Sequence, residues 1–245
     1  MHAHIRSDLP AKEVSTLTGF VVAATRSLDE ARVALMRSDE RVTWGVGCHP
    51  GLVGVQKSFD ISVFEGLSRR SPVVSEVGLD GGSRVPAGLQ ETTFESVLHV
   101  LATAPRIVSV HSAQASKRVL DIVESLPSPG IVLHWWLGDD EQTRRALDLG
   151  CYFSVNSSAR SLSVVSKVPY ERLLPETDHP FGDRRSGKGA RPGNVLDVER
   201  AISRTKGDSI QAVRLQMWRN FATVAAETST SAMFPAAARR QFAAL

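Results

Sequence analysis

The feature that most constrains the fold is a regular alternation of short apolar runs with longer amphipathic stretches along the whole chain. The apolar runs are rich in β-branched and aromatic residues, and several begin after Gly or Pro, as buried parallel strands tend to. They occupy residues 1–5, 19–25, 42–48, 72–79, 106–111, 130–136, 150–155 and 172–178. Strands that alternate with helices form parallel sheets, and eight of them predict an α/β fold closed into a (β/α)8 TIM-like barrel.

The stretches between these runs are typical of helices. Ser27 and Glu30 stand at the capping-box spacing, so a helix is expected to begin there. Residues 113–126 and 139–149 carry apolar side chains with helical spacing. The tail after about residue 194 is expected to be helical and to pack outside the barrel. An open doubly wound sheet is the alternative, but no Gly-rich phosphate loop follows the first strand.

Composition fits one folded unit. The 245 residues contain no repeat, low-complexity tract or linker, so a single domain over 1–245 is expected. No apolar run approaches the roughly 20 residues needed to cross a bilayer, and the chain does not open with a signal-peptide pattern, so no membrane association is expected. Cysteine is scarce, with Cys48 and Cys151 alone, which is typical of a reducing cytoplasm.

A mildly basic charge is concentrated in one segment. The formal net charge is +3, and residues 182–193 hold four basic side chains and one acidic one, which accounts for the whole excess. Glycines and a proline mark this segment as a loop that follows directly after the last expected strand. Its cations are Arg184, Arg185, Lys188 and Arg191. They are expected either to bind the backbone of a nucleic acid or to form an ordinary solvated surface.

Six side chains of metal-binding type stand within or at the ends of five expected strands. They are His2, His4, Glu76, His111, His134 and Asp178. Residues two apart on a strand point to the same face, as the first two histidines do here. The carboxyl ends of barrel strands converge on one mouth, where barrel enzymes place their catalytic groups. Any one of these histidines is more often a satisfied buried residue, but together they predict a site for divalent transition metals.

Longer motifs surround these residues. They are His2-Ala3-His4, residues 45–50 (GVGCHP), residues 75–80 (SEVGLD), Gln90 with Phe94, His111-Ser112, residues 134–138 (HWWLG), residues 152–154 (YFS), residues 173–178 (LLPETD) and Asn220-Phe221. In this order the chain resembles the TatD family of metal-dependent deoxyribonucleases, within the amidohydrolase-like barrels. The resemblance covers nearly the whole chain.

The resemblance implies two divalent ions. It implies a first set of ligands, His2, His4 and Asp178, for one ion. A second set, His111 and His134, would bind the other ion, and Glu76 would bridge the two. Imidazole-rich ligands suit Zn, Mn, Fe or Ni better than Mg, although a bridging carboxylate keeps Mg open. Two cations lower the pKa of a bound water and clamp the attacking and leaving oxygens of a phosphodiester.

Single residues receive roles from the same resemblance. Asp178 is expected to act as general base as well as ligand. His49 is expected to contact a phosphate, or alternatively to bond to the backbone before a turn-forming proline. Glu176, two residues before Asp178, is a candidate acceptor that orients a ligand. The chain also departs from the family, because Ala113 replaces an arginine and His179 replaces a small residue.

The start of the chain departs as well, since Met1 alone precedes His2. The first strand is therefore expected to be short or truncated. TatD-like proteins also occur in anti-phage operons of the Qat type, which implies antiviral defence, with protein partners if the chain works in such a complex.

The predicted function is metal-dependent hydrolysis of single-stranded DNA by a metal-activated water, and the sequence leaves RNA open as an alternative substrate. Two alternatives stay open. The same ion pair can activate water for a small-molecule amide or ester. The chain can also be a non-catalytic, metal-stabilised subunit that holds a partner protein.

Overall fold

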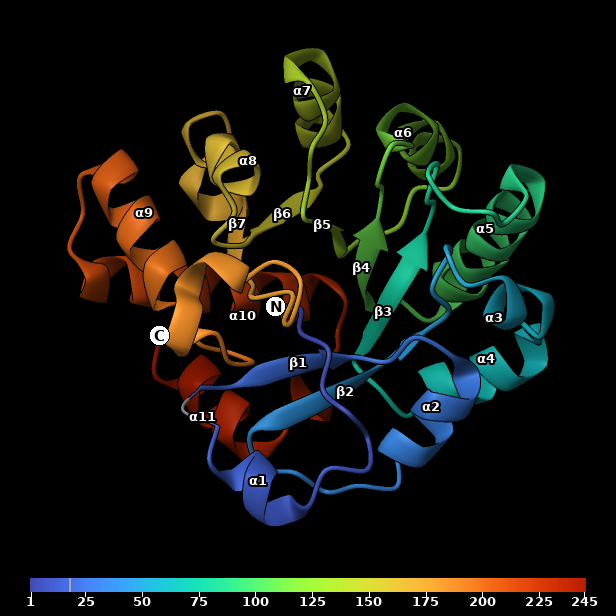
Figure 1. Ribbon diagram of the computed structural model, residues 1–245, viewed down its shortest axis with the longest axis horizontal. Coiled ribbons are helices and arrows are strands. Elements are labelled where there is room, and N and C mark those ends of the chain that lie inside the picture. The colour runs from blue at the N-terminus through green and yellow to red at the C-terminus, as the bar shows by residue number, and fades with distance from the viewer. Residues whose placement is uncertain (18) are drawn as a thin grey trace.

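The computed structural model describes residues 1–17 and 19–245; of Arg185, Lys188 and Gly189 it describes no side chain. Seven parallel strands lie in the order of the sequence and curl into a ring with helices outside (Figure 1). They are β1 (Val21–Ala24), β2 (Val42–Gly47), β3 (Val73–Gly78), β4 (Ile107–His111), β5 (Ile131–His134), β6 (Tyr152–Val155) and β7 (Leu173–Pro175). Each lies inside the run predicted for it, so the barrel-type architecture is confirmed.

The N-terminal segment takes the eighth position, between β1 and β7. Ala3 forms an isolated parallel bridge with Ala23, and its N–H donates to the carbonyl of Val22 at 3.2 Å. On its other side, the N–H of Asp178 donates to the carbonyl of His2 at 2.9 Å. The expected short first strand is thus reduced to a single bridge, and its backbone hydrogen bonds on both sides tie the two edges of the sheet together.

Helices connect successive strands and cover the outer face of the ring. They are α1 (Ala11–Ser15), α2 (Leu28–Ala34), α3 (Val53–Lys57), α4 (Ile61–Ser68), α5 (Ala87–Thr103), α6 (Ser116–Ser125), α7 (Asp140–Asp148), α8 (Ala159–Leu162), α9 (Leu196–Lys206), α10 (Ile210–Glu227) and α11 (Ala236–Ala243), with 3₁₀ helices η1 (Ser163–Ser166), η2 (Tyr170–Arg172), η3 (Arg184–Gly189) and η4 (Ser231–Met233). Ser27 caps α2 as predicted, because its side chain accepts from the N–H of Glu30. Asp139 and Gln142 form a capping box on α7.

The interior of the ring has an apolar floor. Side chains near the amino ends of the strands pack together there, among them Val73, Ile107 and Tyr152. Helices α10 and α11 cover this floor with Phe221 and Ala238, which belong to the same cluster. The C-terminal helices therefore lie outside the sheet, as expected, and they close its lower opening. Polar side chains are left for the opposite end, where the strands finish.

Among the described residues, no helix is long and apolar enough to cross a membrane.

Candidate metal centre

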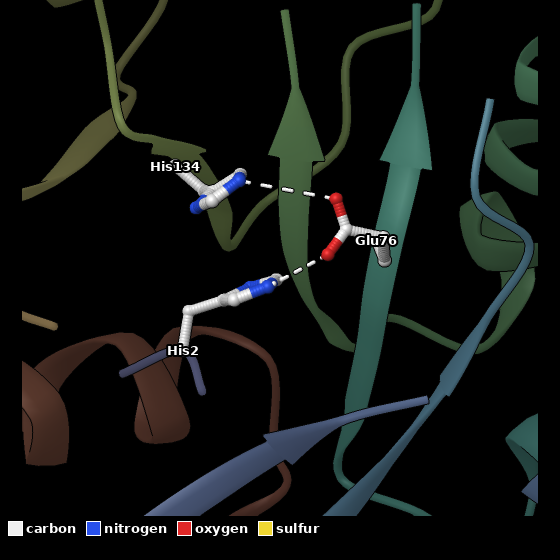
Figure 2. Close-up of side chains that lie close together, drawn as sticks. All are labelled: His2, Glu76 and His134. Carbon is white, nitrogen blue, oxygen red and sulfur yellow. Dashed lines mark hydrogen bonds and ion pairs between the residues drawn. The ribbon is translucent and has the colours of Figure 1, made fainter. Parts of the chain in front are cut away.

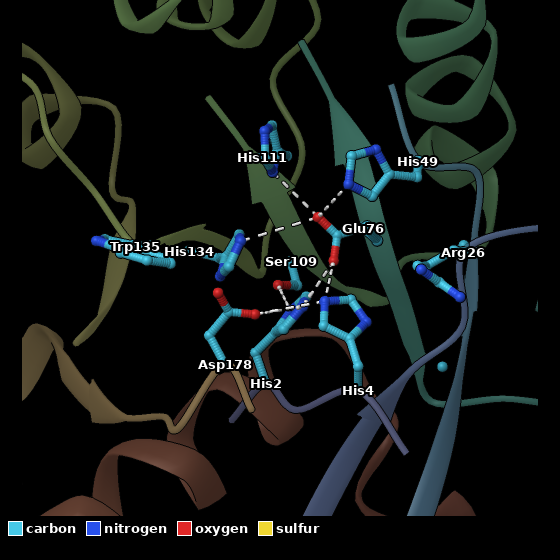
Figure 3. A network of polar contacts seen from close by, with 12 residues as sticks. His2, His4, Arg26, His49, Glu76, Ser109, His111, His134, Trp135 and Asp178 are labelled. Atoms are coloured by element: carbon cyan, nitrogen blue, oxygen red, sulfur yellow. Dashed lines mark hydrogen bonds and ion pairs between the residues drawn. The ribbon is translucent and has the colours of Figure 1, made fainter. Parts of the chain in front are cut away.

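The six predicted side chains meet at the carboxyl end of the ring. The N-terminal segment supplies two histidines, β3, β4 and β5 supply one side chain each, and the loop after β7 supplies the last (Figure 3). Three groups of side chains each have donor atoms within 4.8 Å of one another. The groups are His2, Glu76 and His134; His2, His4 and Asp178; and His49, Glu76 and His111. Parallel strand ends that converge on one mouth bring together residues up to 176 positions apart in the sequence.

Glu76 lies at the middle of this cluster and is almost completely buried. Its Oε2 atom is 2.8 Å from Nε2 of His2 and 3.1 Å from Nε2 of His4 (Figures 2 and 3). The other ring nitrogen of His2, Nδ1, lies 2.8 Å from the hydroxyl of Ser109, which fixes the plane of the ring. One oxygen of the carboxylate therefore serves the two histidines of the N-terminal segment.

The second oxygen of Glu76 faces a different set of imidazoles. Its Oε1 atom is 3.1 Å from Nδ1 of His111, and 3.8 Å from Nε2 of both His134 and His49. A carboxylate whose two oxygens face separate groups of nitrogens has the arrangement of a bridging ligand.

Asp178 completes the first set. Its Oδ1 atom lies 3.4 Å from Nε2 of His4 and 3.8 Å from Nε2 of His2. This oxygen is buried and has no hydrogen-bond partner in the described part of the chain. A buried carboxylate oxygen without a donor is costly unless a cation or water satisfies it. The orphaned oxygen and the nitrogen and carboxylate donors around it fit a divalent metal ion.

The backbone is strained where it presents these side chains. Glu76, Trp135 and Asp178 have positive φ angles of 52°, 41° and 42°, although none is glycine. At Glu76 the register between β3 and β4 also shifts. Positive φ costs a non-glycine residue free energy and persists only where surrounding contacts enforce it, most often at functional sites. Two of these three residues, Glu76 and Asp178, belong to the cluster of donor side chains.

Glu176 supports the centre from below, and its side chain is fully buried. It accepts hydrogen bonds from the N–H of Trp135 at 3.1 Å and from Asn156 Nδ2 at 3.2 Å, and a third from the hydroxyl of Ser154. Its Oε2 atom also lies 3.3 Å from Nδ1 of His134. This places it as an acceptor behind a ligand, the role that its spacing from Asp178 suggested.

The charges of the centre control its protonation. Burial by itself lowers the pKa of His4, but the nearby carboxylates of Asp178 and Glu76 outweigh burial and raise that pKa to about 9. Burial likewise opposes the proton on His134, yet the charge of Glu176 raises the pKa of His134 to about 10. Burial together with the neighbouring His134 lowers the pKa of His2. Positive charge is therefore drawn into this pocket, as a cation site requires.

His49 is oriented differently from the other histidines. Its Nδ1 atom accepts a hydrogen bond of 2.9 Å from the N–H of Gly51, which leaves the proton of the neutral ring on Nε2. Burial lowers the pKa of His49 to about 4, so the ring is neutral at pH 7. Nε2 points at the centre as a donor. The expected backbone bond of His49 is thus present, and its contact with a phosphate stays a prediction.

The basic segment starts beside the centre. Arg184 and Arg191 are exposed, whereas the side chains of Arg185 and Lys188 lie outside the described residues. Sequence reasoning missed Arg26 and Phe181, which line a groove next to His4. Arg26 directly follows the second expected strand, and that position was the available signal. Nothing in the sequence pattern distinguishes Phe181.

Comparisons with known proteins agree with this geometry. A family model described as "TatD related DNase" matches residues 2–225. The uncharacterized metal-dependent hydrolase YcfH of Escherichia coli (strain K12) is 28% identical over 203 residues, which cover 77% of this chain and 75% of YcfH. The 3′-5′ ssDNA/RNA exonuclease TatD of Pantoea ananatis is 23% identical over 224 residues, which cover 83% of this chain and 86% of that protein. The crystal structure of YJJV, a TatD homolog from Escherichia coli K12, matches with a TM-score of 0.77 and 20% identity over 91% of this chain and 96% of that one.

Proposed function

The chain belongs to the family of TatD-related DNases and is a metal-dependent hydrolase, and on that premise we propose that it cleaves phosphodiester bonds in single-stranded DNA. The observation that carries the proposal is Glu76, whose two oxygens face separate groups of imidazoles. A two-ion site is the arrangement that phosphodiester cleavage uses. RNA is a second substrate under this proposal, because the exonuclease of Pantoea ananatis is named for both.

We propose the ligands from the family resemblance and the contacts of Glu76. His2, His4 and Asp178 would hold the first ion, His111 and His134 the second, and Glu76 both. Its Oε2 atom lies 3.1 Å from Nε2 of His4, and its Oε1 atom lies 3.1 Å from Nδ1 of His111 and 3.8 Å from Nε2 of His134. Zn, Mn and Ni suit this imidazole-rich donor set, and Mg is accommodated through the carboxylates.

When bound, the ions supply Lewis acidity, which lowers the pKa of the attacking water and offsets the negative charge of the phosphodiester. Asp178 would accept the proton of that water on its other carboxylate oxygen, since Oδ1 faces His2 and His4 and would bind the first ion. His49 donates from Nε2 to a phosphate oxygen, since Gly51 holds its other nitrogen as an acceptor. Arg184 and Arg191 attract the rest of the strand from the rim, as do Arg185 and Lys188 under the same proposal.

The deciding experiment is hydrolysis of an end-labelled single-stranded oligonucleotide by the purified protein. Each divalent metal is added separately to chelator-treated protein, and the double variant His2→Ala/His4→Ala is assayed beside it. We expect a metal-dependent ladder of products that the variant does not give. His99→Ala, an exposed histidine on α5, serves as the matched control and should cleave like the original protein.

A protein that binds two ions and cleaves no oligonucleotide would contradict this proposal. Hydrolysis of small esters or amides by the same preparation would then favour the small-molecule hydrolase. Binding of ions with no hydrolysis of any substrate would favour the structural subunit.

We further propose a cytoplasmic location. Cys48 and Cys151 are both buried and unpaired, which suits a reducing compartment.

A further inference from the structure

A groove of about 730 Å³ opens next to the metal centre, on the side of His4. The N-terminal segment and α1 form one wall, the connection after β1 and the start of α2 contribute to another, and the segment after Asp178 forms the rest. Its lining is rich in cationic and aromatic side chains, with Arg6, Arg26, His179, Phe181 and Arg191 among them. The groove therefore leads from solvent to the first set of ligands.

Phe181 is an exposed aromatic ring at the inner end of this groove. Phe181 is 45% exposed, although phenylalanine is normally buried in folded proteins. Its ring centroid lies 5.7 Å from that of His4, with the two planes at 76°. The guanidinium carbon of Arg184 lies 5.8 Å from the same ring. The ring is thus held beside a metal ligand with part of its surface open to the groove.

The cations of the groove are available to an anionic ligand. In the described part of the chain, no carboxylate forms an ion pair with Arg26 or Arg191, whereas Arg6 is paired with Asp8. Glu13 and Glu30 also line the groove, and the Oε2 atom of Glu30 accepts a hydrogen bond of 2.7 Å from the backbone N–H of Arg26. Figure 3 shows the side chain of Arg26 on the same side of the centre as His4.

We propose that Phe181 is the stacking platform for the base next to the scissile phosphodiester, with Arg26 and Arg191 contacting the phosphates that follow it along the groove. The proposal rests on the proposed function and names the part of the substrate that this groove recognises. Proteins that bind single strands combine a cationic track with aromatic rings on which bases stack. Both elements occur here, and the ring contacts a ligand of the first ion.

The test compares four variants of the metal-loaded protein: Phe181→Ala, Phe181→Leu, Phe181→Tyr and Phe181→Trp. Loss of one base–aromatic stack should raise the KM for a single-stranded oligonucleotide about tenfold or more in the alanine and leucine variants, with a smaller effect on kcat. Tyrosine and tryptophan should restore the KM, because both keep an aromatic face. Leu215→Ala is the matched control, since Leu215 is 42% exposed on α10 and should leave the kinetics unchanged.

A second substrate series separates stacking from packing against His4. One nucleotide at a time is replaced by an abasic residue near the cleaved end. With the original protein, one of these abasic oligonucleotides should have a KM raised as much as Phe181→Ala raises the KM for the intact oligonucleotide. With the alanine variant, the same abasic oligonucleotide should give no further increase in KM. Full recovery by leucine, or additive losses, would show that the ring only supports His4 and would overturn the inference alone. Absence of any oligonucleotide cleavage by the original protein would overturn the proposed function and this inference with it.

Discussion

The carboxylate of Glu176 lies 3.3 Å from Nδ1 of His134, although 42 positions separate the two residues in the sequence. Because Nδ1 is engaged in this way, the Nε2 atom of the ring is the one turned toward Glu76, 3.8 Å away (Figure 2). An acceptor behind a metal-ligating histidine fixes its tautomer and its orientation and makes the nitrogen more basic. The orientation of His134 therefore depends on a buried residue that lies behind it.

Replacement of Glu176 by glutamine should weaken metal binding without unfolding the protein. Glutamine has nearly the same volume as glutamate. Its amide has one acceptor oxygen, whereas the carboxylate of Glu176 offers two oxygens to the donors around it. We expect a loss of about 10- to 100-fold in metal affinity. Equilibrium dialysis with metal analysis measures it, with Glu171→Gln as an exposed control. Unchanged affinity in Glu176→Gln would mean that His134 is held by packing alone.

Asp178→Asn should retain the fold and lose most of the activity. The residue is buried and its backbone N–H pairs with the carbonyl of His2, a contact that the asparagine preserves. Removing a general base costs about 10²- to 10⁴-fold in rate. The kcat for oligonucleotide cleavage at saturating metal is the measurement, and Asp29→Asn on α2 is the exposed control. A variant with full kcat would refute the role of Asp178 as base.

Metal uptake should release protons. In the metal-free protein His4 and His134, with pKa values of about 9 and about 10, keep their protons at pH 7, and a metal ion must displace them. The apparent metal affinity should therefore rise from pH 6.5 toward pH 9. Calorimetric titration at pH 7 in two buffers of different ionisation enthalpy counts the protons. Equal heats in both buffers would contradict the expectation.

The same two histidines should set the pH dependence of the metal-free fold. Their folded pKa values lie above the unfolded value of about 6.5, so their contribution to the unfolding free energy is fully present below that pH. It is lost as the pH rises through about 9 and about 10. Urea unfolding of chelated protein between pH 6 and pH 10 should show this decline. The double variant His4→Ala/His134→Ala should lack it.

Charge reversal in the basic segment should change salt dependence more than catalysis. Arg184→Glu and Arg191→Glu each remove an exposed cation from the rim. Each lost phosphate contact on a single strand should reduce the slope of log affinity against log salt by about 0.7. Fluorescence anisotropy with a chelated protein and a labelled oligonucleotide gives the slope. Arg219→Glu, an exposed cation on α10, should leave the slope unchanged; identical slopes in all three would exclude the segment from binding.

Sequence periodicity was sufficient for the strands and for which side chains meet at one end of the barrel. Apolar runs fixed the seven strands, because burial on both faces of a parallel strand leaves a continuous apolar signature. The spacing of His2 and His4, and the position of Glu76 near a strand end, predicted one shared mouth because side-chain direction along a strand is a local property. The capping residue Ser27 was equally readable, since its hydrogen bond spans only three positions.

Tertiary structure alone decided how these residues meet. Closure of the ring through the N-terminal bridge at Ala3 sets the distance between strands that never touch in the sequence. The same closure brings His2 to Oε2 of Glu76, and the pairing of β6 with both β5 and β7 puts Glu176 behind His134. The tertiary structure also leaves Phe181 exposed beside His4, where its apolar character would have suggested the core. Local patterns fix direction and burial, but the relative placement of distant segments follows from packing and backbone hydrogen bonds across the whole barrel.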